Sequence, residues 1–233
     1  MSENNFSHLV ENYRTICYNV MNASEKYHSD EKVQIMAVTK TVPVEAINKS
    51  IGLGIKLLGE NRVQEFMSKR DSYDKSADVH FIGHLQTNKV KYIIDSVSMI
   101  QSVDSIRLAE EIDRQSQKSG KIMDILLEVN IGREISKDGV IPEELNELLY
   151  KVSELKSVKV KGLMAIPPVN CNESVFESMQ KLYADIKNKK IDNVEMDILS
   201  MGMSADYELG IKYGSNLVRI GTKLFGARNY TEV

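Results

Sequence analysis

The sequence predicts an α/β fold in which eight strands, each followed by a helix, close into a single (β/α)8 TIM-type barrel with an additional N-terminal helix. Short apolar runs alternate with amphipathic segments along almost the whole chain, which is typical of a parallel sheet covered by helices. About eight such runs fit into 233 residues, near the roughly 250 residues of a typical barrel. The alternative is an open Rossmann-like sheet, but its GxGxxG turn is missing after the first strand.

An amphipathic helix precedes the first strand. Its apolar residues recur at intervals of three and four positions, which places them on one face of a helix. We therefore expect a leading helix within residues 1–28 that packs on the barrel. The residues of this apolar stripe are Phe6, Leu9, Val10, Tyr13, Ile16, Cys17 and Val20.

The first strand and its helix follow directly. The run from Val33 to Val38 is apolar at nearly every position, as expected for a strand covered on both faces. Pro43 then occupies the first turn of a helix, where its missing N–H has no partner to lose. Gly52 and Gly54 end that helix, so these glycines serve as a helix stop and not as a dinucleotide-binding turn.

The same pattern recurs to the end of the chain. Each further apolar run is followed by a segment with helical periodicity, and the segment after the seventh run is short. The periodic segments contain apolar residues such as Phe66, Ile93, Ile112, Leu149 and Phe176. The predicted strands lie within 55–59, 79–83, 97–103, 122–130, 158–166, 197–203 and 217–221.

Composition limits the possible functions. The 30 Lys and Arg residues against 33 Asp and Glu give a net charge of −3, which does not favour nucleic acid. No stretch approaches the roughly 18 apolar residues needed to span a bilayer, and the N-terminus does not resemble a signal peptide. The two cysteines, Cys17 and Cys171, fit neither a disulfide framework nor a zinc site. We expect a cytoplasmic protein that binds neither nucleic acid nor a membrane.

The functional face of a barrel lies at the carboxyl ends of its strands, so the residues that end the apolar runs are candidates for a site. Most of the predicted runs end in a reactive or hydrogen-bonding side chain. These residues are Lys40, Glu60, Asn61, His84, Asn130, Ser200, Ser204 and Arg219.

Lys40 is the most distinctive of these residues. It follows a buried strand, where loss of water favours the uncharged amine and therefore nucleophilic attack. The alternative is an ordinary solvated lysine, because most lysines lie on the protein surface. The functional hypothesis is that Lys40 forms a Schiff base.

The loops after the seventh and eighth predicted strands are rich in glycine and hydroxyl groups. Barrels often bind phosphate with these two loops. Gly221 would let the backbone approach an anion, and Thr222 would donate a hydroxyl. Ser200 and Ser204 favour the phosphate interpretation further, and the alternative is a tight turn that leads into the C-terminal segment.

An amine opposite an anion cradle predicts a ligand with both an aldehyde and a phosphate. Pyridoxal 5'-phosphate (PLP) has both groups. Arg219 would then face the pyridine nitrogen and keep it unprotonated, because a guanidinium cannot accept a proton. The alternative for Arg219 is a surface or interface ion pair.

Two further rim residues have weaker signals. His84 is the one histidine at a predicted strand exit, and we expect it to be a hydrogen-bonded wall of the pocket, since the sequence shows no carboxylate that would orient it. Asn61 is expected to bond the ring hydroxyl of the cofactor, with a helix cap as the alternative. No metal-ligand spacing such as HExxH occurs, so no metal is predicted.

Several separate motifs occur in order along almost the full chain. They are AVTKTVP, LGENRVQE, HFIGHLQTNKVK, LEVNIGRE with SKDGV, KGLMAIPP, LSMGMSADYELGI and VRIGTKLFGARNY. Together they resemble the pyridoxal phosphate homeostasis proteins, also called the PROSC or YggS-type family. Because several motifs match in register, the resemblance is specific. One departure is Gly214–Ser215–Asn216, where the family commonly has GST before the last strand.

The resemblance implies a barrel like the N-terminal domain of alanine racemase, with all of 1–233 forming one PLP-binding domain. It further implies that Lys40 forms the internal aldimine with PLP, that the glycine and hydroxyl residues hold the phosphate, and that Arg219 faces the pyridine nitrogen. No residue is assigned a catalytic role. The cofactor-binding residues implied are Lys40, Asn61, His84, Ser200, Met201, Ser204, Arg219, Gly221 and Thr222.

The function that the resemblance implies is vitamin B6 and amino-acid homeostasis, without catalytic turnover. An amino-acid racemase is the alternative, but the short tail after Arg219 leads us to expect that the second domain of alanine racemase is absent and the site open to water. A Schiff-base aldolase acting on sugar phosphates is a third hypothesis. We expect a monomer whose partners are PLP and PLP-dependent apoenzymes.

Overall fold

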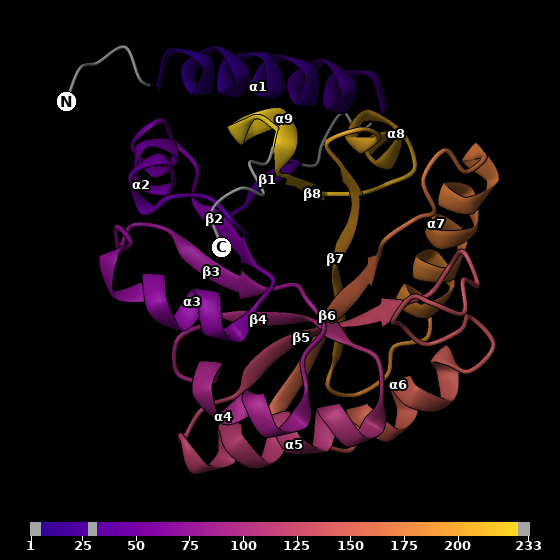
Figure 1. The fold of residues 1–233 in the computed structure, drawn as a ribbon. Coiled ribbons are helices and arrows are strands. Elements are labelled where there is room, and N and C mark those ends of the chain that lie inside the picture. The colour runs from indigo at the N-terminus through magenta and orange to yellow at the C-terminus, as the bar shows by residue number, and fades with distance from the viewer. Residues whose placement is uncertain (1–5, 28–31, 228–233) are drawn as a thin grey trace.

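Eight parallel strands form a closed barrel in this computed structural model, which describes residues 6–27 and 32–227 (Figure 1). Each strand pairs with the next one along the chain, and β8 pairs with β1. The predicted (β/α)8 barrel is therefore confirmed. The strands are β1 (Gln34–Val38), β2 (Leu57–Glu60), β3 (Asp78–Phe81), β4 (Met99–Val103), β5 (Met123–Val129), β6 (Val158–Ala165), β7 (Val194–Met203) and β8 (Leu217–Ile220).

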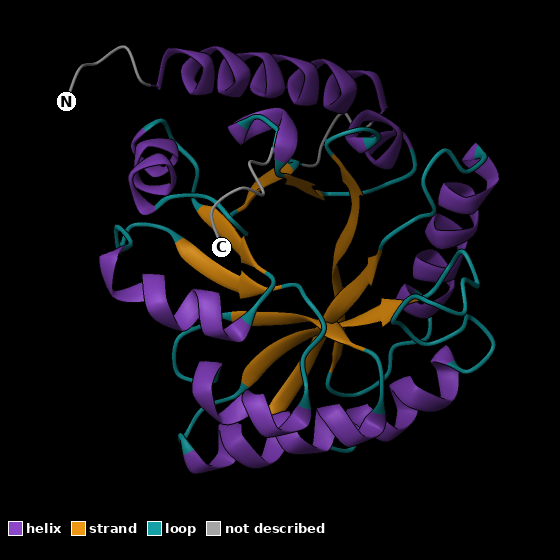
Figure 2. Cartoon of the chain, viewed as in Figure 1, coloured by secondary structure: helices purple, strands orange, loops and turns teal. Residues whose placement is uncertain are grey.

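Helices surround the strands as an outer layer (Figure 2). The predicted helices are found, although the fourth is reduced to a short 3-10 turn, Thr87–Lys89, followed by a single α-helical turn. The α-helices are α1 (Ser7–Tyr27), α2 (Val44–Gly52), α3 (Val63–Lys69), α4 (Val90–Ile93), α5 (Ile106–Lys118), α6 (Leu145–Ser153), α7 (Glu173–Lys187), α8 (Tyr207–Lys212) and α9 (Thr222–Phe225).

Alternate side chains of each strand pack on opposite sides of the barrel wall. Ala37 and Leu58 belong to the large core between the strands and the helices, whereas Met36 and Leu57 belong to a separate cluster inside the barrel. A second interior cluster contains Met99, Leu126 and Met164. This period of two follows from the pleat of a strand. Polar residues at the same alternate positions as the interior apolar residues, such as those on β3, β4, β7 and β8, therefore also face the interior.

The leading helix α1 lies across α2, α8 and α9, as predicted (Figure 1). Its buried residues include Leu9 and Ile16, which belong to the apolar stripe found in the sequence. The side chain of Asn12 donates a hydrogen bond of 3.1 Å to the carbonyl of Leu224 in α9. Positions 1–5 and 28 of the predicted segment lie outside the described residues.

The seventh strand ends where the predicted run 197–203 ends, at Met203, and it begins earlier, at Val194. Of the two residues placed at its end, Ser204 directly follows the strand, whereas Ser200 lies within it. The pairing with β8 contains a bulge, because Ser200 pairs with Leu217 while Met203 pairs with Arg219, which leaves one extra residue in β7. Gly202 takes a φ of +92° in this bulge, a conformation that glycine adopts easily.

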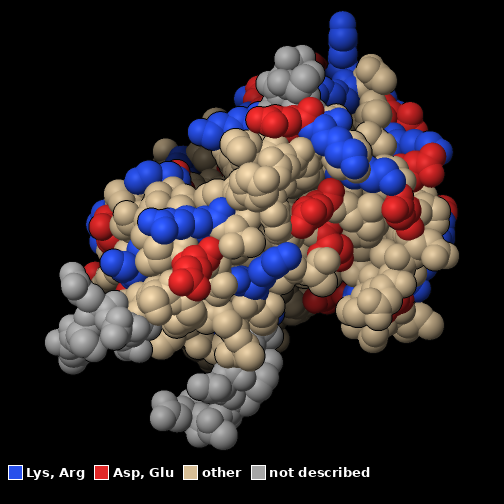
Figure 3. Space-filling model, turned by 90° about the horizontal axis from the view of Figure 1, so that it is seen from above, with Lys and Arg blue, Asp and Glu red and all other residues tan. Residues whose placement is uncertain are grey.

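The described residues include no membrane-spanning helix, and the face seen in Figure 3 has no field of one charge sign. No helix in these ranges is both long and apolar enough to cross a bilayer. Figure 3 views the molecule from the side where α1 lies, and basic and acidic side chains alternate across that face. This mixture agrees with the small net charge of −3.

Candidate functional site

The loops that follow β1 and β8 lie side by side at the carboxyl end of the barrel. Ala37 of β1 pairs with Ile220 of β8. Lys40 follows Ala37 by three residues and Thr222 follows Ile220 by two, so both residues lie just past the ends of neighbouring strands. A Cβ atom placed on Gly221 would lie 3.5 Å from the Cβ of Val38. Lys40 is half-buried. The structure thus brings the predicted amine and the predicted anion cradle to the same rim.

The two neighbours of Lys40 are held by glutamates from the next strand and helix. Thr39 donates its hydroxyl to Glu60 over 2.5 Å, and the backbone N–H of Thr41 donates to Glu65 over 2.6 Å. Thr41 has a φ of +61°, which is strained for a β-branched residue. The chain therefore turns sharply just after Lys40, and hydrogen bonds on both sides hold that turn.

The glutamate on β2 is itself deeply buried. Tyr73 donates a second hydrogen bond of 2.6 Å to Glu60. Burial raises the pKa of Glu60, although the hydrogen bonds from Thr39 and Tyr73 oppose this shift. The sequence placed Glu60 at a strand exit but gave no sign that its side chain reaches back to the strand that precedes Lys40, because this contact depends on how β1 and β2 pair.

Asn61 follows β2 at the same rim. Its Oδ1 atom is buried and has no hydrogen-bond partner in the described part of the chain. The helix-cap alternative is wrong, since Arg62 occupies the capping position of α3 and no side chain caps that helix. A Cβ atom on Gly83 would lie 2.1 Å from the backbone oxygen of Asn61, so only glycine lets the β3 exit pass this close.

Ser204 connects the loops after β7 and β8. Its Oγ accepts hydrogen bonds from the N–H groups of Gly221 at 3.1 Å and Lys223 at 3.2 Å. Because the oxygen accepts twice, the hydroxyl proton remains available to a ligand. Thr222 is exposed at the start of α9. Ser204, Gly221 and Thr222 therefore lie together, as a phosphate cradle requires.

Ser200 and Met201 lie elsewhere. The Ser200 hydroxyl is fully buried in the barrel, where it donates to Gln101 over 2.8 Å and accepts from Arg219 over 2.6 Å. The Met201 side chain packs outward in the large core, and its N–H donates to Ser215. Contacts of these two residues with a cofactor stay a prediction, and the hydroxyl of Ser200 is already engaged within the barrel.

Arg219 lies inside the barrel and is only 3% exposed. It donates to the backbone oxygens of Ser200 and Ala165, each over 2.8 Å. Burial lowers the pKa of Arg219 to about 10, and the negative charge of Glu128 opposes that shift. The alternative of a surface ion pair for Arg219 is wrong, because the residue is buried inside the barrel.

His84 is exposed at the exit of β3 and has a carboxylate beside it. Its Nδ1 lies 3.1 Å from Asp138, which belongs to the loop after β5. Asp104 completes a group of three donor atoms that lie within 4.8 Å of one another. The sequence missed this pairing, because Asp138 is 54 positions away and no local signal links the two residues. A role of His84 in cofactor binding stays a prediction.

Glu128 is a buried acid that the sequence did not single out. It lies on β5 and is 6% exposed. Burial raises the pKa of Glu128 to about 7, the charge of Asp138 raises it further, and Arg219 lowers it. Its neighbours Leu127 and Val129 point outward into the large core, so the alternation along β5 directs the Glu128 side chain into the barrel. This alternation is the signal that could have identified Glu128.

We expect Glu128→Gln to change the pH dependence of stability. The folded protein holds a proton on Glu128 up to about pH 7, whereas the ordinary pKa is 4.5. The free energy of unfolding therefore falls as the pH rises between these values. Glu128→Gln should remove this fall, so its free energy of unfolding at pH 8 should exceed that of the wild type by up to about 3 kcal/mol. Urea titrations from pH 4 to 8 measure the free energy of unfolding, and the exposed Glu110→Gln is the control. Parallel curves of stability against pH for Glu128→Gln and the wild type would contradict the prediction.

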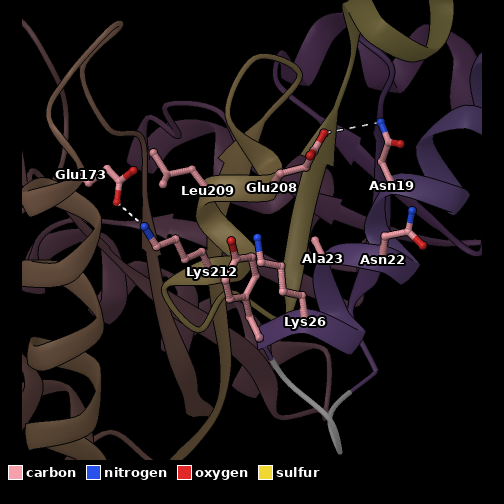
Figure 4. A pocket seen from close by; sticks show the side chains of 9 residues that line it. Asn19, Asn22, Ala23, Lys26, Glu173, Glu208, Leu209 and Lys212 are labelled. Carbon is pink, nitrogen blue, oxygen red and sulfur yellow. Dashed lines mark hydrogen bonds and ion pairs between the residues drawn. The ribbon is translucent and has the colours of Figure 1, made fainter.

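A cavity of about 320 Å³ lies between α1 and α8, away from the carboxyl rim of the barrel (Figure 4). Lys212 pairs there with Glu173, and Asn19 donates to Glu208 over 3.4 Å. Its polar groups bond one another and join α1 to the barrel, so this cavity belongs to the packing of the leading helix.

Comparison with known proteins identifies the family of this chain. The family "Alanine racemase, N-terminal domain" matches residues 12–229. The pyridoxal phosphate homeostasis protein of Aquifex aeolicus is 46% identical over 202 residues, which cover 84% of this chain and 88% of the relative. The protein of the same name from Haemophilus influenzae is 34% identical and covers 98% and 97%. This chain belongs to the pyridoxal phosphate homeostasis protein family.

Solved structures extend the comparison. PipY of Synechococcus elongatus PCC7942, in a structure with PLP bound, superposes with a TM-score of 0.82 at 29% identity and covers 94% of this chain and 100% of PipY. Alanine racemase of Clostridium difficile 630 has a TM-score of 0.74 at 16% identity and covers 96% of this chain but 61% of the racemase. This second likeness shows that the homeostasis protein family and the racemase share the barrel fold.

Proposed function

We propose that this protein binds PLP at the carboxyl rim, holds it through the Lys40 amine, and acts in intracellular vitamin B6 and amino-acid homeostasis without catalytic turnover. The observation that carries the proposal is the adjacent placement of Lys40 after β1 and of Gly221 and Thr222 after β8. PipY, a structural relative with PLP bound, supports it, as do the names of the homeostasis proteins.

The residues of the rim fit this cofactor. The orphaned Oδ1 of Asn61 offers an acceptor at the site, and a side chain at Gly221 would contact Val38 at the cradle. When bound, PLP supplies an aldehyde that condenses reversibly with an amine. Lys40 would provide that amine, Ser204 and Thr222 would donate hydroxyl protons to the phosphate, and Arg219 would present a donor-only group to the ring.

The proposal extends to the organisation of the protein. Residues 1–233 would form one PLP-binding domain, with 1–28 as the leading helix, in a cytoplasmic monomer. An open rim would let free amines or PLP-dependent apoenzymes take up the cofactor. His84 with Asp138 would form a polar wall of the rim.

An amino-acid racemase is the second candidate function, because Glu128 offers a buried acid with a pKa of about 7 beside Arg219. Such a group suits general acid–base chemistry at neutral pH. The two functions differ in turnover. Sustained exchange of the α-deuterium of amino acids for solvent protons would favour the racemase, and no exchange beyond one event per protein would favour the homeostasis protein.

The absorbance spectrum of the protein loaded with PLP tests the proposed function. We expect a yellow chromophore that sodium borohydride bleaches, and a pyridoxyl mass on the peptide that contains Lys40. A mass on any other lysine would overturn the assignment. A colourless protein that instead traps a keto-sugar would identify a Schiff-base aldolase.

We expect Ser204→Ala to weaken binding of PLP about tenfold and to leave pyridoxal, which lacks the phosphate, unaffected. The variant loses one hydroxyl donor and the acceptor that orders Gly221 and Lys223, and a hydrogen bond worth about 1 to 1.5 kcal/mol corresponds to that factor. Absorbance titrations with both ligands measure it. Ser178→Ala on the exposed face of α7 is the matched control, and equal weakening for both ligands would contradict the prediction.

A further inference from the structure

A chain of hydrogen bonds crosses the barrel interior from β3 to β8. It joins His80 to Gln101, Gln101 to Ser200 and Ser200 to Arg219 over 2.8, 2.8 and 2.6 Å. All four residues are at most 8% exposed. The chain runs between the two interior apolar clusters, so water does not compete for its bonds.

The bonds of this chain follow one direction in the structure. A guanidinium only donates, so the Ser200 oxygen accepts from Arg219, and the Ser200 hydroxyl donates to Gln101 Oε1. The Gln101 amide then donates to Nδ1 of His80. In this arrangement His80 is neutral and carries its proton on Nε2. Burial also lowers the pKa of His80 to about 4, which agrees with a neutral ring.

The far end of the chain opens into a second cavity. His80 lines a cavity of about 800 Å³ at the amino ends of β1 to β4, under α1 and on the side opposite Lys40. Nδ1 of His80 is bonded to Gln101, so Nε2 is the ring nitrogen left to bind a ligand. No protein hydrogen bond of Nε2 is found among the residues that the structure describes. His80, which is only 8% exposed, thus contributes its ring to the cavity wall with one nitrogen not engaged by the protein.

The walls of the cavity determine what it can accept. Leu57, Met99 and Ile198 are apolar lining residues close to His80, whereas charged lining residues such as Lys56 and Asp78 are exposed at the mouth. The lysines of the lining, Lys32 and Lys56, are solvent-exposed. An anion beside the neutral imidazole would therefore lose its hydration for little compensating charge, which is costly. An uncharged oxygen that accepts the Nε2–H bond avoids that cost.

We propose that this cavity is a second binding site, for a small apolar molecule with one uncharged oxygen acceptor, and that its occupancy is transmitted to Arg219 through Gln101 and Ser200. A ligand that accepts from Nε2 stabilises the tautomer in which Nδ1 accepts from Gln101. The opposite tautomer would turn the Gln101 amide and direct a second donor at Ser200. Binding therefore favours one arrangement of the whole hydrogen-bond chain, because the ligand has a higher affinity for one of its two states.

The test uses the full-length protein without cofactor and two probes of matched size. 4-Phenyl-2-butanone has a carbonyl oxygen, and butylbenzene has none. In ¹⁵N-labelled protein we expect the ketone to shift the Nε2 resonance of His80 in a saturable way and to bind at least about tenfold more tightly than butylbenzene. In His80→Phe, which keeps an apolar ring, the two probes should bind equally.

A second variant tests transmission. The ketone should shift the guanidinium resonances of Arg219 in the wild type and leave them unchanged in Gln101→Met, which keeps the length of the side chain but breaks the hydrogen bonds. Equal affinity for the two probes in the wild type, or no saturable binding of the ketone, would overturn the site. Arg219 shifts of the same size in Gln101→Met would overturn the transmission. None of these readouts depends on Lys40 or PLP, so their failure is distinct from failure of the proposed function.

Discussion

Lys40→Ala should abolish the borohydride-trapped pyridoxyl mass completely while leaving the fold intact. The amine is the group proposed to bond the cofactor covalently, and its half-buried place at the rim lets the alanine side chain be accommodated without a large cavity. Ser204, Gly221 and Thr222 remain, so phosphate-dependent binding should persist. We expect that residual affinity to be lower by more than about tenfold, or about 1.4 kcal/mol.

Mass spectrometry of the reduced protein measures the adduct, and equilibrium dialysis measures the residual affinity. Lys118→Ala, at the exposed end of α5, is the matched control and should keep the full adduct. Circular dichroism checks that both variants fold. An adduct of wild-type yield in Lys40→Ala would contradict the assignment of the amine.

Arg219→Leu should lower the free energy of unfolding by about 3 to 5 kcal/mol, the range typical of removing one partner from a buried charged network. The guanidinium is 3% exposed and donates to both oxygens of Ser200 and to the carbonyl of Ala165. Leucine would leave these acceptors buried and unpaired. Loss of the positive charge should also raise the pKa of Glu128 above about 7.

Urea denaturation gives the change in stability, and carboxyl ¹³C resonances give the titration of Glu128. Arg114→Leu on α5 is the matched control, because Arg114 is exposed and pairs with Glu111 on the same helix, so we expect little change there. Arg219→Lys, which keeps a charge but loses the planar fork, should lie between wild type and Arg219→Leu. A loss in Arg219→Leu no larger than in Arg114→Leu would show that the interior network contributes little to stability.

The prediction from sequence succeeded where a short segment contains its own signal. The apolar run before Lys40 and the run before Gly221 each identify a strand exit without knowledge of their neighbours. It misplaced Ser200, which lies within β7 and not at its end, beside a β-bulge that arises from pairing with β8. It also missed Glu128, whose inward direction becomes evident only once the outer core is known.

The sequence by itself determined the alternation of strands and helices, the leading helix, and the residue types available at the rim. Tertiary structure alone decided which of them meet: Asp138 reaches His84, Glu60 holds Thr39, and Gln101 joins His80 to Ser200. The physical reason is that hydrophobic periodicity is set by neighbours three or four positions apart. Hydrogen bonds between strands depend instead on barrel closure and register, which bring together residues far apart in the sequence, such as Gln101 and Ser200, 99 positions apart.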